Sequence, residues 1–71
     1  MKELNINIGS EYLVDHCRKG KFFGRLEFYD EEWLVFVVTR GKPGAALAYN
    51  EKDIGEEVIV RKGFCSLTEI K

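Results

Sequence analysis

Hydrophobic and polar residues alternate over several short stretches of the chain, which is the pattern of half-buried β-strands. One stretch, 33–39, is instead apolar at nearly every position, as expected of a central strand that is covered on both faces. No stretch of ten or more residues shows the 3.6-residue period of an amphipathic helix. Strands are therefore expected at 4–8, 12–17, 22–29, 33–39, 57–61 and 64–70.

Alternation within 22–29 indicates which residues line the core. Phe22, Gly24, Leu26 and Phe28 share one face of this strand, and we expect that face to be buried. Gly24 has no side chain to pack, so it marks either the corner of a barrel or a close approach of another strand. For 12–17 the pattern leaves open which face points inward.

Glycine, proline and charged residues predict the turns between the strands. Turns are expected at 18–21, 30–32, 40–44 and 62–63. The region after the third turn is less regular, because 45–49 is short and small-sided while 50–55 is polar. A single helical or 3₁₀ turn over 51–54 fits this region.

These elements predict one all-β domain spanning 1–71. A chain of 71 residues buries only about 60% of its unfolded surface and cannot divide a core between two domains. Short strands joined by tight turns cannot enclose a core as one flat sheet. We therefore expect a small, strongly bent antiparallel barrel of five or six strands.

Composition excludes several classes of protein. The chain is 45% hydrophobic and 32% charged, which is typical of a folded domain, and its net charge of −1 shows no overall basic excess for nucleic acid. The longest apolar run, 33–38, is far shorter than the roughly twenty residues of a membrane-spanning helix. Residues 1–7 lack a signal-peptide pattern, so a cytoplasmic protein without membrane contact is expected.

The cysteines and the single histidine suggest no catalytic site. Cys17 and Cys65 belong to no CxxC pair, so we expect reduced thiols, with a disulfide between them or a metal as less favoured alternatives. The disulfide requires the first long strand to lie beside the last. His16 and Cys17 are neighbours on a strand and therefore point to opposite faces, unlike a catalytic dyad. No catalytic residue, metal or cofactor is predicted, and 30–32 is expected to be a solvated acidic turn.

The order of motifs from 12 to 36 resembles the first half of an Sm-like domain. An apolar strand leads into a Lys-Gly-Lys turn at 19–21, then Phe-Gly-Arg-Leu at 23–26, Phe-Tyr-Asp at 28–30 and a second apolar strand. Residues 58–63 are similar to the second signature of that family, an apolar strand running into an Arg-Gly turn, with Lys62 interposed here. The resemblance covers about half of the chain. Similar turns recur in SH3, KOW and Tudor-like barrels.

The resemblance implies an SH3-like or Sm-like barrel that binds single-stranded RNA, with Trp33 as a base-stacking side chain. Leu34 follows where the family usually has Asn, so amide contacts that read uridine are not implied. The positions of the basic residues support the same hypothesis, because Arg and Lys beside aromatic rings hold single strands through phosphate contacts and stacking. The candidates are Arg18, Lys19, Lys21, Tyr29, Trp33, Arg40, Lys42, Arg61 and Lys62, with Phe23 and Tyr49 as further stacking residues.

A non-enzymatic interaction or assembly module, self-associating and binding a protein partner, is the favoured hypothesis. An open barrel leaves edge strands, and 57–61 has few features that prevent pairing with another copy. Val58, Ile59 and Val60 are the candidate oligomer edge. Assembly would also support a core that by itself contributes about 3–5 kcal/mol. A third alternative, an aromatic cage for methylated Lys or Arg, requires three or four aromatic residues around one pocket.

Overall fold

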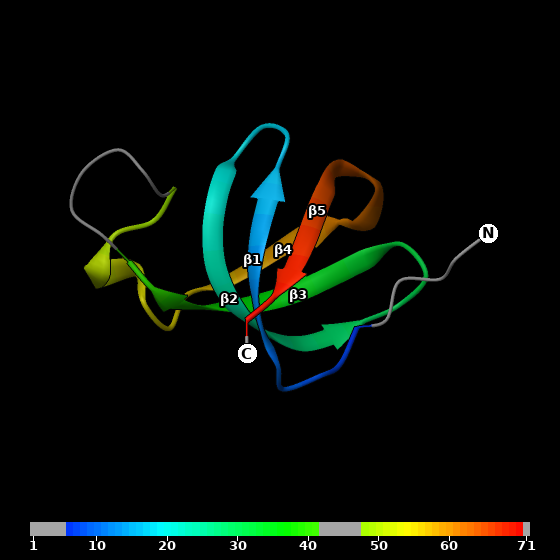
Figure 1. The fold of residues 1–71 in the computed structure, drawn as a ribbon, viewed down its shortest axis with the longest axis horizontal. Helices are drawn as coiled ribbons and strands as arrows, with labels where there is room; N and C mark the ends of the chain where they lie inside the picture. Colours follow the sequence, from blue (N-terminus) through cyan, green and yellow to red (C-terminus); the bar gives the residue numbers. More distant parts are fainter. Residues whose placement is uncertain (1–5, 42–47, 71) are drawn as a thin grey trace.

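Five antiparallel strands form one sheet in residues 6–41 and 48–70, the part of the chain that this computed structural model describes (Figure 1). The strands are β1 (Glu11–His16), β2 (Gly20–Tyr29), β3 (Trp33–Arg40), β4 (Glu57–Arg61) and β5 (Cys65–Glu69). Two single 3₁₀ turns accompany them, η1 (Glu51–Asp53) and η2 (Lys62–Phe64). The predicted all-β class is confirmed. None of the helical segments described has the length and apolar character needed to span a membrane.

The sheet is bent and open. Its strand order is β4-β3-β2-β1-β5, so β2 is the central strand, a position that the sequence pattern assigned to 33–39. Figure 1 shows the strong curvature of β2, and the strand order puts β4 and β5 at the two edges of the sheet. The edge strands do not pair with each other, so the predicted closure into a barrel is not confirmed.

One face of the bent sheet holds the hydrophobic core. The rings of Phe22 and Phe36 meet edge to face inside it, with centroids 5.9 Å apart. On β1 the inward residues are Tyr12, Val14 and His16, which settles the orientation that the sequence left open. The buried hydrophobic residues are Tyr12, Val14, Phe22, Leu26, Leu34, Phe36, Val38, Val58 and Val60.

Gly24 allows β2 and β3 to approach each other closely. A Cβ atom on Gly24 would lie 3.0 Å from the Cβ of Phe36 and 3.3 Å from the Cε2 of Phe22. The strand register also shifts between Phe23 and Gly24. Of the two roles considered for this glycine, close approach of another strand is therefore the one observed.

A β-bulge in the second half of β2 exchanges its two faces. Leu26 lies opposite Phe36, but Phe28 lies opposite Val35, so Glu27 is an additional residue on β2. Phe36 faces the core and Val35 does not, and Phe28 consequently points outward with 56% of its surface exposed. The prediction that Phe28 lies on the core face is wrong, because a strict two-residue period assumes that no bulge intervenes.

β3 is buried on one face only. Leu34, Phe36 and Val38 are buried, whereas Trp33 on the opposite face is 39% exposed. The prediction that this strand is covered on both faces is wrong for the part of the chain described. The outward apolar residues of β3 are left on an accessible surface of the sheet.

The segment before β1 differs from its prediction. Residues 6–10 form no strand, and Leu4 lies outside the described residues. Ile6 nevertheless packs against the core, and the backbone N–H of Asn7 donates to the Tyr12 hydroxyl at 2.8 Å. Core packing, this side-chain hydrogen bond and two backbone hydrogen bonds, from Gly9 N–H to the Leu26 carbonyl and from Leu26 N–H to the Ser10 carbonyl, hold the segment without forming a strand.

The irregular region after β3 contains the turn expected there. The 3₁₀ turn η1 begins after Asn50, whose side chain accepts a hydrogen bond from the Lys52 N–H at 3.2 Å. Asp53 completes the cap by accepting from the Asn50 N–H at 3.0 Å. Residues 42–47, which include most of the predicted loop and most of 45–49, lie outside the described part.

Candidate interaction surface

Two cation–aromatic pairs lie at the end of the sheet where β3 begins and β4 ends. The guanidinium carbon of Arg61 lies 4.8 Å from the centroid of the Trp33 ring, and Lys62 Nζ lies 5.1 Å from that of Tyr29. The register places Trp33 directly opposite Arg61. The pairing of β3 with β4 thus brings Trp33 and Arg61 together on the outer face, whereas Tyr29 lies opposite the buried Leu34, so its pair with Lys62 is on the other face of the sheet.

Acidic residues offset the charge of this group. Arg61 Nη2 is 3.0 Å from the Glu32 carboxylate. Asp30 Oδ1 accepts from the backbone N–H groups of Glu32 and Trp33, each at 2.9 Å. These hydrogen bonds lower the pKa of Asp30, and the nearby Lys62 lowers it further. The lowered pKa keeps Asp30 ionised at neutral pH near Lys62, and Glu32 already pairs with Arg61, so acidic groups at this site disfavour a phosphate.

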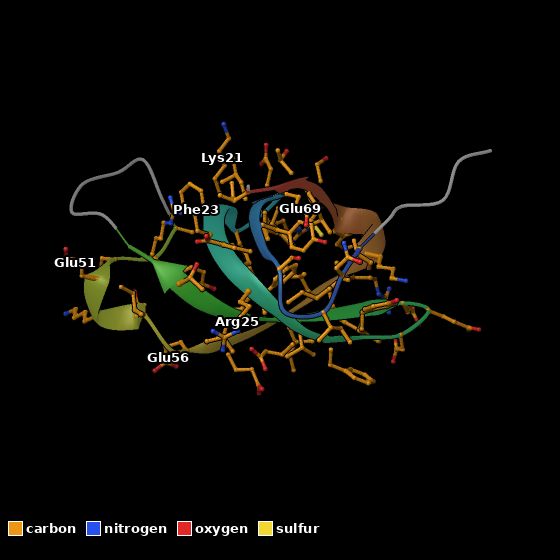
Figure 2. All side chains as sticks on the ribbon, turned by 60° about the horizontal axis from the view of Figure 1, so that its bottom comes forward. Lys21, Phe23, Arg25, Glu51, Glu56 and Glu69 are labelled. Carbon is orange, nitrogen blue, oxygen red and sulfur yellow. The ribbon has the colours of Figure 1, made fainter. Side chains whose placement is uncertain are left out.

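The other predicted nucleic-acid residues lie elsewhere. Arg40 is at the opposite end of β3, where it stacks 4.9 Å from the Phe23 centroid and forms an ion pair with Glu11 at 2.9 Å. Figure 2 shows Lys21 and Phe23 close together near this end of β2 and Arg25 farther along it.

The remaining candidates do not join that group. Arg18 and Lys19 belong to the β1–β2 turn, and Lys42 lies outside the described residues. Tyr49 packs edge to face on Phe22 at 5.3 Å, which makes it a half-buried neighbour of the core. The predicted set therefore does not form one continuous basic surface.

His16 stabilises the β1–β2 turn. Its side chain is almost fully buried, and its Nδ1 accepts from the backbone N–H groups of Arg18 and Lys19, both at 3.1 Å. Its ring also meets Phe64 edge to face at 6.3 Å. The hydrogen bonds give His16 a structural role in the turn. Its contact with Phe64 joins residues far apart in the sequence, so it could not be predicted from the sequence alone.

Apolar side chains form a strip across the outer face of the sheet. The register aligns Phe28 on β2, Val35 on β3 and Ile59 on β4, and we call these three residues the outer strip. Phe28 is 56% exposed and Ile59 is 55% exposed, while Val35 between them is half-buried. Phe28 was missed as a surface residue because the bulge that turns it outward has no marker in the sequence.

Charges of both signs flank the outer strip. Arg25 Nε lies 2.6 Å from the Glu27 carboxylate near one side of it. The Arg61–Glu32 pair lies toward the other side, one register position beyond Leu34 and Val60. A surface bordered by both arginine and glutamate can meet a second copy of itself without like charges facing each other.

Only one residue of the predicted oligomer edge is available to a neighbour through its side chain. Val58 and Val60 are 6% and 2% exposed and belong to the core, so they would take part in an oligomer edge through their backbone and not through their side chains. Their burial follows from the two-residue period of β4, which directs alternate side chains inward. Ile59, between them, points outward.

Among residues 6–41 and 48–70, only β3 pairs with β4, which leaves the other backbone edge of β4 free of described strands. The N–H of Val38 donates to the carbonyl of Glu56, and the N–H of Lys62 donates to that of Glu32. Alternate residues of an antiparallel strand exchange hydrogen bonds with the same neighbour, so the backbone groups of Ile59 face away from β3. Ile59 therefore belongs both to this free edge and to the outer strip.

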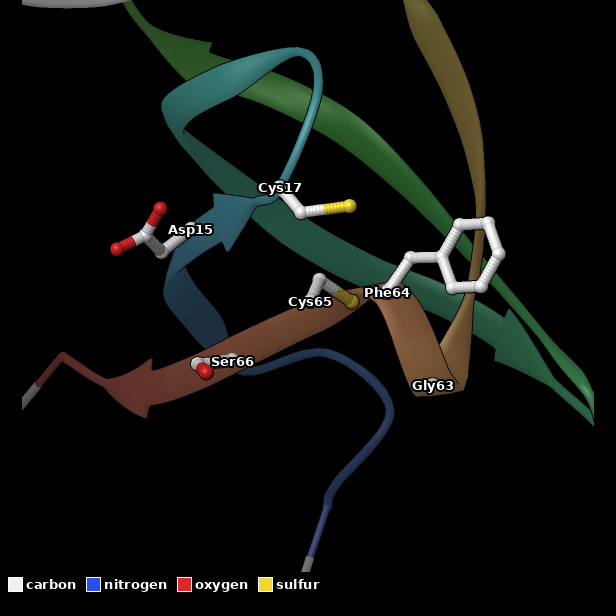
Figure 3. A pocket seen from close by; sticks show the side chains of 6 residues that line it. All are labelled: Asp15, Cys17, Gly63, Phe64, Cys65 and Ser66. Atoms are coloured by element: carbon white, nitrogen blue, oxygen red, sulfur yellow. The ribbon is translucent and has the colours of Figure 1, made fainter.

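A shallow pocket of about 350 Å³ lies beside η2 (Figure 3). Phe64 is its one aromatic lining residue, fewer than the three or four that an aromatic cage requires. Cys17 and Cys65, both with free thiols, also line it. Within 6–41 and 48–70, no group of three or more His, Cys, Asp or Glu side chains is arranged to hold a metal ion.

Comparisons with known proteins provide no relative for this chain. No protein-family model matches it, and neither a curated protein nor a solved structure shows significant similarity.

Proposed function

We propose that this protein is a non-enzymatic interaction module that self-associates through the β4 edge and the outer strip and also binds a protein partner. The observation that supports the proposal is the position of Ile59, which is 55% exposed on a strand with a free backbone edge. An exposed apolar residue on an unprotected edge strand favours pairing with another chain.

The outer strip gives this pairing an apolar component. Burying a large apolar side chain stabilises a complex by about 1.5–3 kcal/mol relative to leaving it exposed. Phe28 and Ile59 are each more than half exposed, so each would contribute part of that range. The mixed charges beside the strip favour a copy of the same chain as the occupant, because its arginines and glutamates complement their counterparts.

An SH3-like or Sm-like barrel is the finer form of the proposed fold. The three residues of η2 connect β4 directly to β5, so the connected ends of the two edge strands stay close in space (Figure 1). A strand from a second copy that pairs with β4 would extend the bent sheet toward closure. In this proposal the strand that brings the sheet closer to a barrel comes from a second copy of the chain.

Replacing Ile59 with Lys tests the proposal. We expect the native chain to have a mass in solution that is a multiple of 8.2 kDa, and Ile59→Lys to reduce it toward a single chain. The matched control is Ile54→Lys, since Ile54 is similarly exposed, at 49%, but lies between η1 and β4 and is not part of the edge strand. Sedimentation velocity measures the mass, and circular dichroism shows that each variant is folded.

A native chain that remains monomeric at high concentration would contradict the proposal. So would a folded Ile59→Lys variant with unchanged mass, or an equal loss of mass in the Ile54→Lys control. Partner binding would then have to involve another surface.

Binding of single-stranded nucleic acid is the second candidate function. It is favoured by the two cation–aromatic pairs at this end of the sheet, Arg61 with Trp33 and Lys62 with Tyr29. If these cations contact phosphates, affinity for a short RNA must fall steeply with salt concentration, and changing Arg61 and Lys62 to Ala must reduce that slope. Fluorescence anisotropy measures both, and an affinity that does not respond to salt removes this candidate.

A further inference from the structure

The junction of β1 and β5 holds two thiols in neighbouring register positions. His16 lies opposite Cys65, and the N–H of Cys17 donates to the Phe64 carbonyl at 2.9 Å. Strands about 5 Å apart with a rise of about 3.3 Å per residue place the Cα atoms of Cys17 and Cys65 about 6 Å apart. Most protein disulfides have Cα separations of about 4.4–6.8 Å. Cys17 follows the last residue of β1 and belongs to the turn, so strand alternation with His16 does not fix its direction, and this separation is compatible with a bond to Cys65.

The two side chains also open onto the same pocket. Figure 3 shows Cys17 and Cys65 extending toward the same side of the junction, next to Phe64. Cys17 is exposed, whereas Cys65 is half-buried. Burial raises the pKa of the Cys65 thiol, and the neighbouring Cys17 raises it further. One thiol is thus accessible to a reagent from solution, and the other lies close behind it.

We propose that Cys17 and Cys65 are a reversible modification site, which a small-molecule disulfide such as oxidised glutathione converts into an intramolecular disulfide. This proposal goes beyond the proposed self-association and does not rest on it. In this proposal the two cysteines exist in two states, the reduced thiols predicted from the sequence and the disulfide.

The reaction proceeds by two thiol–disulfide exchanges. The thiolate of Cys17 first attacks one sulfur of oxidised glutathione, breaking its S–S bond and releasing one glutathione thiolate. The thiolate of Cys65 then attacks the Cys17 sulfur of this mixed disulfide, forming the Cys17–Cys65 bond and releasing the second glutathione. The two protons lost by the cysteines are taken up by the two released thiolates. Two protein thiols are oxidised, and one glutathione disulfide is reduced to two glutathione molecules.

Cys17 is the attacking residue because it is exposed and its thiol is not buried against the sheet. Cys65 is the resolving residue, since its register position beside His16 keeps it near Cys17 after the first step. The new bond would join the end of β1 to the start of β5 and close a long loop of the chain. Closing such a loop stabilises the folded state chiefly by restricting the unfolded chain.

Oxidation of the purified full chain in glutathione buffers tests the proposal. The chain is equilibrated at increasing ratios of oxidised to reduced glutathione, quenched with an alkylating reagent in denaturant, and measured by intact mass spectrometry. We expect the unalkylated product to lose two hydrogens, to yield a peptide that links Cys17 to Cys65, and to return to two free thiols with dithiothreitol. Oxidation should raise the melting temperature by about 10 °C or more.

Two single substitutions separate the roles of the thiols. Cys65→Ser should accumulate one glutathione on Cys17, because no resolving thiol remains, and Cys17→Ser should be glutathionylated more slowly at Cys65. The native chain alone is also decisive. If it stops at a glutathione adduct, links to a second chain, or retains both free thiols at high oxidised glutathione, the proposal is wrong.

Discussion

Replacing Gly24 with Ala tests whether close packing between β2 and β3 limits the stability of the sheet. The added Cβ would lie 3.0 Å from the Cβ of Phe36, 3.3 Å from the Cε2 of Phe22 and 3.3 Å from the Val37 carbonyl oxygen. Carbon atoms pack best at about 3.5–4.0 Å, so the neighbours would have to move by several tenths of an ångström. Phe22 and Phe36 are completely buried and have little room to do so.

Two opposing effects determine the expected change in stability. Inserting a methyl group into a close-packed core costs about 1–3 kcal/mol. Reduced freedom of the unfolded chain offsets about 0.4–1 kcal/mol of that cost when alanine replaces glycine. The net expectation for Gly24→Ala is a loss of about 1–2 kcal/mol in the free energy of unfolding. In a domain of this size, each kcal/mol lowers the melting temperature by about 4–8 °C.

Gly63→Ala is the matched control. A Cβ atom at Gly63 would have no neighbour within 4 Å, and the backbone there does not adopt a left-handed conformation. The same chemical change should therefore be neutral or slightly stabilising. Urea unfolding followed by circular dichroism and by fluorescence of the single tryptophan, Trp33, measures both variants. Equal stabilities for Gly24→Ala and Gly63→Ala would refute the packing argument.

Three further predictions concern the turns and the thiols. His16→Phe removes the acceptor of two turn N–H groups and should cost about 1–3 kcal/mol, seen as faster hydrogen exchange of those amides; unchanged exchange would contradict this role. Because hydrogen bonds lower the folded pKa of Asp30, its stabilising effect is present above the ordinary value of 3.8 and lost as pH falls through the folded pKa. Asp30→Asn should therefore lower the melting temperature at pH 7 but not at about pH 2, and an equal effect at both would refute it. Since burial raises the pKa of Cys65, a thiol reagent should modify Cys17 first, which peptide mapping of partly labelled protein checks; preferential labelling of Cys65 would contradict it.

Local sequence determined most of the secondary structure. Alternation and glycine-containing turns correctly indicated the strands that became β1, β2, β4 and β5, because side-chain direction in a strand depends only on its two-residue period. Gly20 illustrates the turns, since its φ of 93° is a conformation that glycine adopts without strain. Four of the predicted surface residues, Tyr29, Trp33, Arg61 and Lys62, could likewise be selected by residue type and by their position in or next to a predicted turn.

Tertiary structure decided which of these residues share a surface. Antiparallel pairing of β3 with β4 places Trp33 beside Arg61, while the length of β3 keeps Arg40 at its other end. The bulge at Glu27 turns Phe28 outward, and pairing with the core residues Phe36 and Leu34 places Val58 and Val60 on the core face. Register, bulges and edges depend on hydrogen bonds and packing between segments far apart in the chain, whereas hydrophobic periodicity reports only on neighbouring residues.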